Sequence, residues 1–265
     1  MDGLLLDRDE FLVLLNATGA QGVIGLNQDE LFPASIDDLR RSVEVGQRKL
    51  AARGLLQQAP DGVFELSELV LMIATVVAAP DLAVISMRDV PKRGRQLLLH
   101  YLVGDFVVEQ TLPAEGQHRL ATLPNRAALV SRLVEFFSIK TSLPHETQTQ
   151  LPEADFNALV AEAITDRSAV FERLISAGVT AETAALLVET LVEPLLRGTV
   201  ALLRIREATI SDGRNPALAI GLRAAWAFFQ TVPGEPRVTL MTIDANRLGT
   251  LLAGWLAELS AEPTS

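Results

Sequence analysis

One segment of the chain occurs twice, so any fold for this sequence must accommodate a repeated unit. Gln-Thr-Val-Pro at 230–233 echoes Gln-Thr-Leu-Pro at 110–113, which lies 120 positions earlier. A polar turn follows both, and Arg-Val-Thr-Leu at 237–240 then echoes Arg-Leu-Ala-Thr at 119–122 with an offset of 118. The second turn is therefore two residues shorter than the first. This pattern predicts an internal duplication.

Each copy closes with an amphipathic run, and the offset of 118 predicts which positions correspond. It pairs Leu133 with Leu251 and Phe137 with Trp255. Each aromatic residue lies four positions after a leucine, and residues at this spacing share one face of a helix. We therefore expect Phe137 and Trp255 to be core anchors of two equivalent helices.

The elements expected before each copy follow one order, in which helices precede a proline and then strands. We expect a first repeat over 1–140, an exposed polar linker at 141–152 and a second repeat over 153–262. Long strands joined by short turns pair antiparallel, and helices on one face of such a sheet give an α+β fold. The sequence therefore predicts an α+β protein of two similar helix-plus-antiparallel-sheet repeats, related by pseudo-two-fold symmetry and joined in one globular unit.

Local signals give the expected element boundaries. Asp7 or Asp9 should begin one helix and Ser35 another, because short polar side chains accept hydrogen bonds from the free amides of a first turn. Ser211-Asp212-Gly213 is a turn signal. Strands are expected at Leu82 to Val90, at Gln96 to Leu112 with a break at Gly104-Asp105, at Arg119 to Leu123, at Thr199 to Ala208 and at Ala217 to Val232.

Composition excludes several classes of protein. The net charge of -10 repels phosphate backbones, so nucleic acid is not expected as a partner. The absence of cysteine excludes disulfides, thiolate metal sites and a cysteine nucleophile. The most apolar run, Leu69 to Ala79, is shorter than the roughly 18–20 residues of a membrane-spanning helix. Acidic residues interrupt the apolar N-terminal stretch, unlike in a signal peptide. We expect a cytoplasmic protein without a membrane partner.

No pattern of catalytic residues is present. His100, His118 and His145 fall on a strand, in a turn and in the linker, and no two have the spacing of a helical metal-binding pair. The chain lacks a nucleophile elbow, a P-loop and a calcium-binding loop. Acid pairs such as Asp37-Asp38 stand at helix starts, where the helix dipole explains them. We expect no catalytic residue, no cofactor, no metal and no enzymatic activity.

A first basic group precedes the Pro-Asp-Gly turn at 60–62 and gives an alternative function. It consists of Arg40, Arg41, Arg48, Lys49 and Arg53. A helix, a turn and a strand in this order resemble a winged helix, which would be a transcriptional regulator binding DNA through the Arg40–Arg53 helix. The same helix carries acids, and spacing of four pairs Asp37 with Arg41 and Glu44 with Arg48, which favours a self-paired surface.

A second basic group, formed by Arg88, Lys92, Arg93 and Arg95, lies at one hairpin. The corresponding place in the second repeat holds Ser211-Asp212-Gly213-Arg214, so the fold does not require these charges. They indicate either an ordinary solvated loop or a contact with an acidic patch on a partner.

Several stretches of the first half resemble the EspG family, the cytosolic chaperones of type VII (ESX) secretion. They are Leu-Ala-Ala-Arg-Gly-Leu-Leu at 50–56, Asp61-Gly62, Glu65-Leu66, the apolar run that ends at Pro80, and Asp-Leu-Ala-Val at 81–84. The similarity of organisation extends over most of the chain. It implies a mixed fold with pseudo-two-fold symmetry, no catalysis, and binding of the helical tip of a secreted PPE-type partner.

The resemblance also implies where that partner would bind, namely at a hairpin turn between strands and at the helices of the second half. By position these are Pro113 to His118 and Glu153 to Glu193. The residues that we assign to the partner surface are Pro113, Glu115, Gln117, His118, Leu187 and Leu191. The partner is expected to be a secreted helical protein or a second copy of the chain in a homodimer.

Overall fold

A computed structural model describes residues 3–58, 64–140, 146–232 and 234–261. The described residues form two compact units that are interleaved along the chain. The first contains residues up to Ile85, Leu97–Leu129 and Arg204–Ser211. The second contains Ser86–Gln96, Val130–Leu203 and the residues from Asp212 onward.

The first unit is an antiparallel sheet with helices packed against it. Its strands lie in the order β1-β7-β6-β5-β4. Their bounds are Leu4–Asp7 for β1, Gln117–Leu123 for β7, Phe106–Thr111 for β6, Gly94–Val103 for β5 and Leu82–Val90 for β4, although the turn between β4 and β5 belongs to the second unit. A separate pair joins β2 (Leu56–Gln58) to β3 (Phe64–Leu66). The helices are α1 (Arg8–Thr18), α2 (Gln28–Leu31), α3 (Ile36–Ala52) and α4 (Glu68–Ala78).

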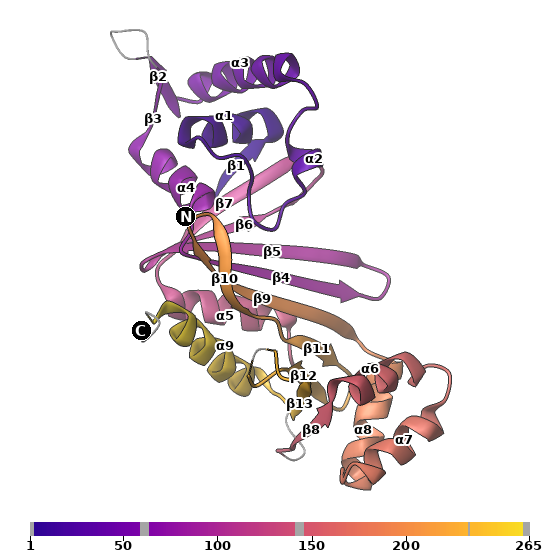
Figure 1. Ribbon diagram of the computed structural model, residues 1–265. Helices are drawn as coiled ribbons and strands as arrows, with labels where there is room; N and C mark the ends of the chain where they lie inside the picture. Colours follow the sequence, from indigo (N-terminus) through magenta and orange to yellow (C-terminus); the bar gives the residue numbers. More distant parts are fainter. Residues whose placement is uncertain (1–2, 59–63, 141–145, 233, 262–265) are drawn as a thin grey trace. The chain divides into compact units, whose positions relative to one another are not determined.

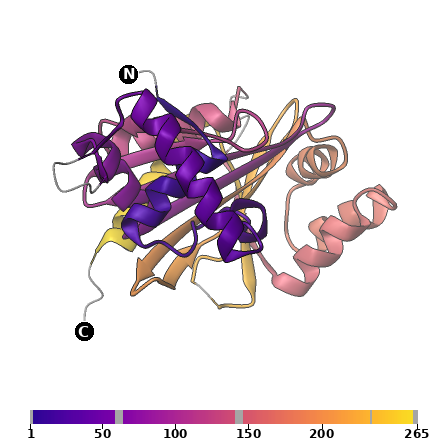
Figure 2. The ribbon, with the colours of Figure 1, turned by 90° about the horizontal axis from the view of Figure 1, so that it is seen from above.

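Helix α1 is the central helix of this unit, since it contacts β1, β7, α3 and α4 (Figure 1). Asp7 begins it in a capping box, in which the Asp7 carboxylate accepts from the Glu10 amide at 3.0 Å and Glu10 accepts from the Asp7 amide at 2.9 Å. Figure 2 shows α1 and α3 from a second direction, both in indigo. Gly46 of α3 permits their close approach, because a Cβ there would lie 2.2 Å from the carbonyl oxygen of Asp9.

The second unit is also antiparallel, with the strand order β9-β11-β12-β13-β8 and β10 paired with β9. The bounds are Leu196–Arg206 for β9, Thr209–Arg214 for β10, Ala217–Ile220 for β11, Ala225–Phe229 for β12, Arg237–Thr242 for β13 and Gln148–Pro152 for β8. Its helices are α6 (Glu153–Glu162), α7 (Arg167–Ser176), α8 (Ala181–Val192), α9 (Ala245–Ser260) and most of α5 (Arg126–Phe137). The last residues of β9 and the first of β10 belong to the first unit.

Two groups of helices pack on the strands of the second unit. Helices α6, α7 and α8, in salmon, gather together (Figures 1 and 2) and share a core with Trp226, Phe228 and Leu240. Helix α9 packs on β12, where Phe229 and Trp255 meet edge to face at 5.1 Å. The expectation of buried aromatic anchors at Phe137 and Trp255 is confirmed. The α+β class is confirmed as well.

Helices α5 and α9 begin with similar caps but match with an offset of 119 instead of 118. The Asn125 side chain accepts from the Ala128 amide at 2.9 Å, and Asp244 accepts from the Arg247 amide at 2.7 Å. The buried positions of the two helices are Leu129, Leu133, Phe136 and Phe137 in α5, and Leu248, Leu252, Trp255 and Leu256 in α9. The burial pattern therefore does not reproduce the predicted pairings of Leu133 with Leu251 and of Phe137 with Trp255. Leu251 is only half-buried, and at a spacing of 119 Trp255 falls at the position of Phe136.

Three sequence expectations differ from the structure. The polar stretch expected as a linker contains β8, because Leu151 is buried there and the strand pairs with β13; residues 141–145 lie outside the described residues. Ser211-Asp212-Gly213 lies inside β10, and the turn before it falls at Glu207 and Ala208, which adopt positive φ of 50° and 59°. The region expected as one long strand, Ala217 to Val232, divides into β11 and β12.

Candidate protein-binding surfaces

The first candidate surface is α8, which carries two of the residues assigned to partner binding. Thr180 begins this helix by accepting from the Thr183 amide at 3.3 Å. Leu187 is only 1% exposed and belongs to the core that α6–α8 form with β12 and β13. Leu191 is half-buried against the same core. The apolar stripe of α8 is thus mainly a core stripe, and Leu187 stabilises the fold from within.

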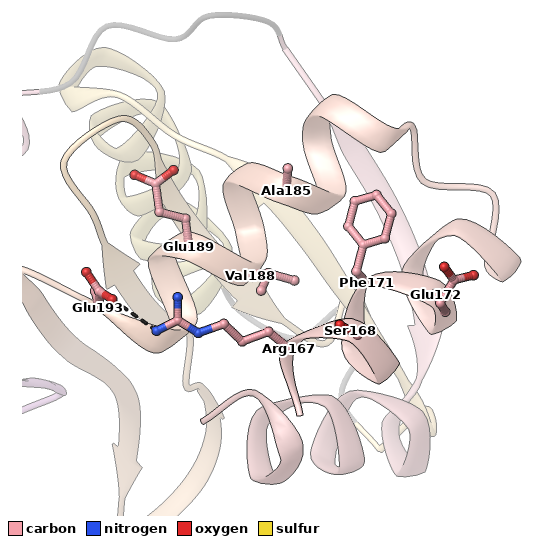
Figure 3. Close-up of a pocket in the computed structure, with 8 residues that line it drawn as sticks. All are labelled: Arg167, Ser168, Phe171, Glu172, Ala185, Val188, Glu189 and Glu193. Carbon is pink, nitrogen blue, oxygen red and sulfur yellow. Dashed lines mark hydrogen bonds and ion pairs between the residues drawn. The ribbon is translucent and has the colours of Figure 1, made fainter. Parts of the chain in front are cut away.

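A shallow hollow of about 510 Å³ lies between α7 and α8. Figure 3 shows Arg167 extended toward Glu193, and this ion pair measures 3.0 Å. The hollow is lined by Arg167, Ser168, Phe171, Glu172, Ala185, Val188, Glu189 and Glu193. Phe171 and Val188 supply apolar surface. Of the carboxylates around them, Glu193 pairs with Arg167 and Glu189 pairs with Arg223 at 3.3 Å. This α7–α8 hollow can hold an apolar side chain of another protein with a basic group beside it.

The second candidate surface is the turn between β6 and β7 in the first unit. Pro113, Glu115 and Gln117 are exposed there, as a contact surface requires. Gly116 has a φ of 66°, which favours glycine, and the Gln117 amide donates to the Ala114 carbonyl at 3.0 Å. The turn is therefore closed by its own backbone, with its side chains directed to solvent.

His118 differs from its neighbours in the turn because its side chain is only 6% exposed. Its ring stacks on Phe11 with 4.2 Å between ring centroids. Its Nδ1 accepts from the amide nitrogen of Gln110 at 2.9 Å, and the amide oxygen of Gln110 accepts from the Tyr101 hydroxyl at 3.0 Å. Burial lowers the pKa of His118 to about 4. His118 therefore anchors the turn to the interior of the unit and offers little surface to a partner.

A groove of about 340 Å³ borders this turn in the first unit. Leu112 and Glu115 line it on the turn, and Leu31 and Arg8 line it on the helices. The Arg8 guanidinium donates to the Leu31 carbonyl at 2.8 Å, which holds the loop after α2 against α1. The exposed turn residues thus stand beside a depression that can receive a side chain of a partner.

Helix α3, the proposed DNA-reading helix, has paired charges instead of a continuous positive face. Arg40 pairs with Asp37 at 3.9 Å and Arg41 with Asp38 at 3.4 Å. These pairs have a spacing of three, which also places side chains on one face of a helix, instead of the expected Asp37–Arg41 pair. The expected Glu44–Arg48 pair is not among the ion pairs of the described residues.

The basic end of α3 is paired with α1. Lys49 contacts Asp7 at 2.7 Å and Asp9 at 3.1 Å, and Arg53 contacts Glu10 at 2.7 Å. Burial opposes ionisation of Asp7, but hydrogen bonds from Lys49 and from backbone amides hold its pKa below the ordinary value. These charges join α3 to α1 and are not directed to a phosphate backbone.

The described residues contain no group of histidine and acidic side chains that could hold a metal ion. His100 is buried between strands with its Nε2 3.1 Å from a Glu109 oxygen, and His145 lies outside the described residues. No helix within the described ranges has the length and apolar character needed to cross a lipid bilayer.

Comparison with known proteins gives a match in fold. No model of a protein family matches the sequence, and no curated protein matches it. Among solved structures, the chain is similar to the Mycobacterium tuberculosis type VII secretion system chaperone EspG5, determined in complex with a PE25-PPE41 dimer. The TM-score is 0.68 over 96% of this chain and 95% of that chain, at 15% sequence identity. The resemblance expected from the sequence is thus confirmed for the fold.

Proposed function

We propose that this protein is a non-catalytic chaperone that binds a secreted helical protein in the cytoplasm. The observation that carries the proposal is the likeness to EspG5, which spans nearly the full length of both chains. That neighbour is a chaperone whose structure holds a PE25-PPE41 dimer. A fold shared over 96% of this chain and 95% of the neighbour supports a shared protein-binding role.

The exposed residues Pro113, Glu115 and Gln117 form the proposed contact surface on the first unit, beside the groove lined by Leu112. Leu191 and the α7–α8 hollow form the contact surface on the second unit. His118 and Leu187 hold these surfaces in place from inside the fold, since both are buried. Binding through short exposed turns on packed strands lets a chaperone release its client without a chemical step.

The paired charges of α3 do not favour the alternative function, DNA binding by a winged-helix regulator. A DNA-reading helix needs basic side chains free to approach phosphates and base edges. Four of the five cations of the helix, Arg40, Arg41, Lys49 and Arg53, have carboxylate partners, and only Arg48 has none among the described residues. Salt-sensitive DNA binding that is abolished by Arg41→Glu would restore the alternative.

Recovery of a client from native cell extract tests the chaperone function. The tagged chain should recover a small helical secreted protein, identified by mass spectrometry. The variant Pro113→Gly, Glu115→Ser, Gln117→Ser should lose that protein, because only exposed side chains of the contact surface change. Glu235→Ser, in an exposed turn of the second unit, is the matched control and should retain it. Recovery of the bait alone, in low and high salt, would contradict the function.

We also propose that the two units descend from one duplicated unit. The strand orders support this, because β1-β7-β6-β5-β4 and β8-β13-β12-β11-β9 place corresponding elements in the same sequence from the edge. The caps Asn125 and Asp244 and the burial patterns that follow them support it further. The offset changes from 118 in the strands to 119 in the helices, so one residue was gained between them.

A further inference from the structure

A groove of about 600 Å³ in the second unit is lined by basic side chains and has no part in the surfaces described above. It lies between the turn that joins β4 to β5, the end of α5, the start of β9 and the turn from β11 to β12. Its basic side chains are Arg88, Arg93, Lys140 and Arg223, and no carboxylate is among the described residues that line it. We name it the cationic groove. In a chain of net charge -10, such a grouping of one sign needs a cause.

Arg88 fixes the base of the cationic groove. Its guanidinium donates to the Phe136 carbonyl at the end of α5, and its carbon lies 4.5 Å from the centre of the Phe136 ring. Its Nε donates to the Gln96 side chain at 2.6 Å. Burial lowers the pKa of Arg88, and the nearby charges of Arg132 and Arg93 lower it further. Arg223, on another side of the groove, pairs with Glu189 of α8 at 3.3 Å, so Arg93 and Lys140 are the exposed cations of the lining that are left for a partner.

Two exposed leucines border the cationic groove and are held there by the backbone. Leu195 is 53% exposed and Leu222 is 75% exposed. The Leu195 amide donates to the Ile220 carbonyl at 2.7 Å, and the Gly221 amide donates to the Ala224 carbonyl at 2.8 Å. A Cβ at Gly221 would lie 2.8 Å from the Thr190 hydroxyl of α8, so glycine keeps this turn close to α8. Leu222 is therefore presented to solvent from a fixed turn, and Leu195 from the segment just before β9, which is tied to β11.

We propose that the cationic groove docks an acidic amphipathic helix of the client protein. Carboxylates of the helix would meet Arg93 and Lys140, and aliphatic side chains on its adjacent face would pack on Leu195 and Leu222. A helix presents both sets together, since residues three and four apart share a face. Charge complementarity selects the partner and speeds its approach, while the leucines add affinity that persists in salt. The inference rests on the proposed chaperone function, because it defines the chemistry of the client.

The test uses fluorescent peptides of about 18 residues, measured by anisotropy. One peptide forms a helix with leucines on one face and glutamates beside them, a second replaces the glutamates by lysines, and a third scrambles the first. The first should bind, and the other two should bind at least ten-fold more weakly. Equal binding of the lysine peptide would overturn the charge complementarity. Equal binding of the scrambled peptide would show that the groove binds any polyanion, and would overturn the claim that it recognises an amphipathic helix.

Two variants of the protein and one control variant complete the test. The double variant Arg93→Glu, Lys140→Glu changes two exposed side chains and leaves the hydrogen bonds of Arg88 in place. It should weaken binding of the glutamate peptide at least ten-fold. Leu222→Asp should weaken binding of the same peptide even at high salt, where the ionic contribution to binding is screened. Arg237→Glu, exposed in the same unit and absent from the groove lining, should leave binding unchanged. Unchanged binding by the Arg93/Lys140 variant would overturn the proposal.

The same variants separate failure of this inference from failure of the chaperone function. If the native protein recovers a client from extract and the Arg93/Lys140 variant recovers it equally, the groove is not the docking site and the function stands. If the native protein recovers none, the chaperone function fails, and the peptide measurements then decide the groove by themselves.

Discussion

The buried histidine of the β6–β7 turn should make the protein lose stability between neutral pH and pH 5. The pKa of His118 is about 4 in the folded chain against an ordinary value of 6.5, so the folded state binds fewer protons than the unfolded state in this window. The contribution of His118 to the free energy of unfolding is fully present above its pKa in the unfolded chain. It is lost as the pH falls toward its pKa in the folded chain. Linkage gives a loss of about 2 kcal/mol between pH 7.5 and pH 5.

The perturbation that isolates this effect is His118→Asn. The asparagine oxygen can accept from Gln110 as Nδ1 does, but it carries no proton that titrates in this range. Urea unfolding followed by circular dichroism at pH 7.5 and pH 5 should show a loss about 2 kcal/mol smaller in the variant than in the native protein. Contributions of groups outside this contact are common to both proteins and cancel in the difference. Equal pH dependence of the two proteins, or an NMR titration of His118 near 6.5, would refute the reasoning.

The remaining predictions concern stability. Leu252→Ala should cost about 2–5 kcal/mol in urea unfolding, whereas Leu251→Ala should cost under about 1 kcal/mol; the reverse order would contradict the offset of 119. Trp255→Ala should cost about 3–5 kcal/mol, and an unchanged melting temperature would show that this residue is not a core anchor. Gly46→Ala should separate α3 from α1, because the added Cβ meets the Asp9 carbonyl, and should lower the melting temperature; an unchanged value would disprove that contact.

Local signals in the sequence predicted the elements that depend on local physics. Ser35 accepts from the Asp38 amide at 3.1 Å and begins α3, as its side chain predicts. The strand expected at Leu82 to Val90 is β4 with those bounds. The break expected at Gly104 separates β5 from β6, where Gly104 has a φ of 55°. These features are set by a few neighbouring residues, and a single sequence contains them.

Features that depend on distant partners could not be predicted in this way. Gln148–Pro152 is polar and becomes a strand only because β13, far along the chain, supplies hydrogen bonds and a place for Leu151. The turn at Glu207-Ala208 uses positive φ at residues that rarely adopt it, so no turn signal marks it.

The candidate site shows the same limit. Leu187 and Leu191 lie four residues apart on one helix, and only packing against β12 and β13 buries the first more deeply than the second. His118 belongs to a polar stretch, and its burial depends on Phe11 and Gln110. The basic group at the β4–β5 turn was visible in the sequence. Its meeting with Lys140 and Arg223 required the fold.

The mass of the protein bound to its client tests the chaperone function most directly. The chain would be co-expressed with the secreted protein recovered from extract, and the mixture measured by size-exclusion chromatography with light scattering. The account predicts one stable species whose mass is the 28.6 kDa of the chain plus that of the client. A chain that elutes with its own mass or with twice that mass, separate from every recovered protein, would contradict the proposal.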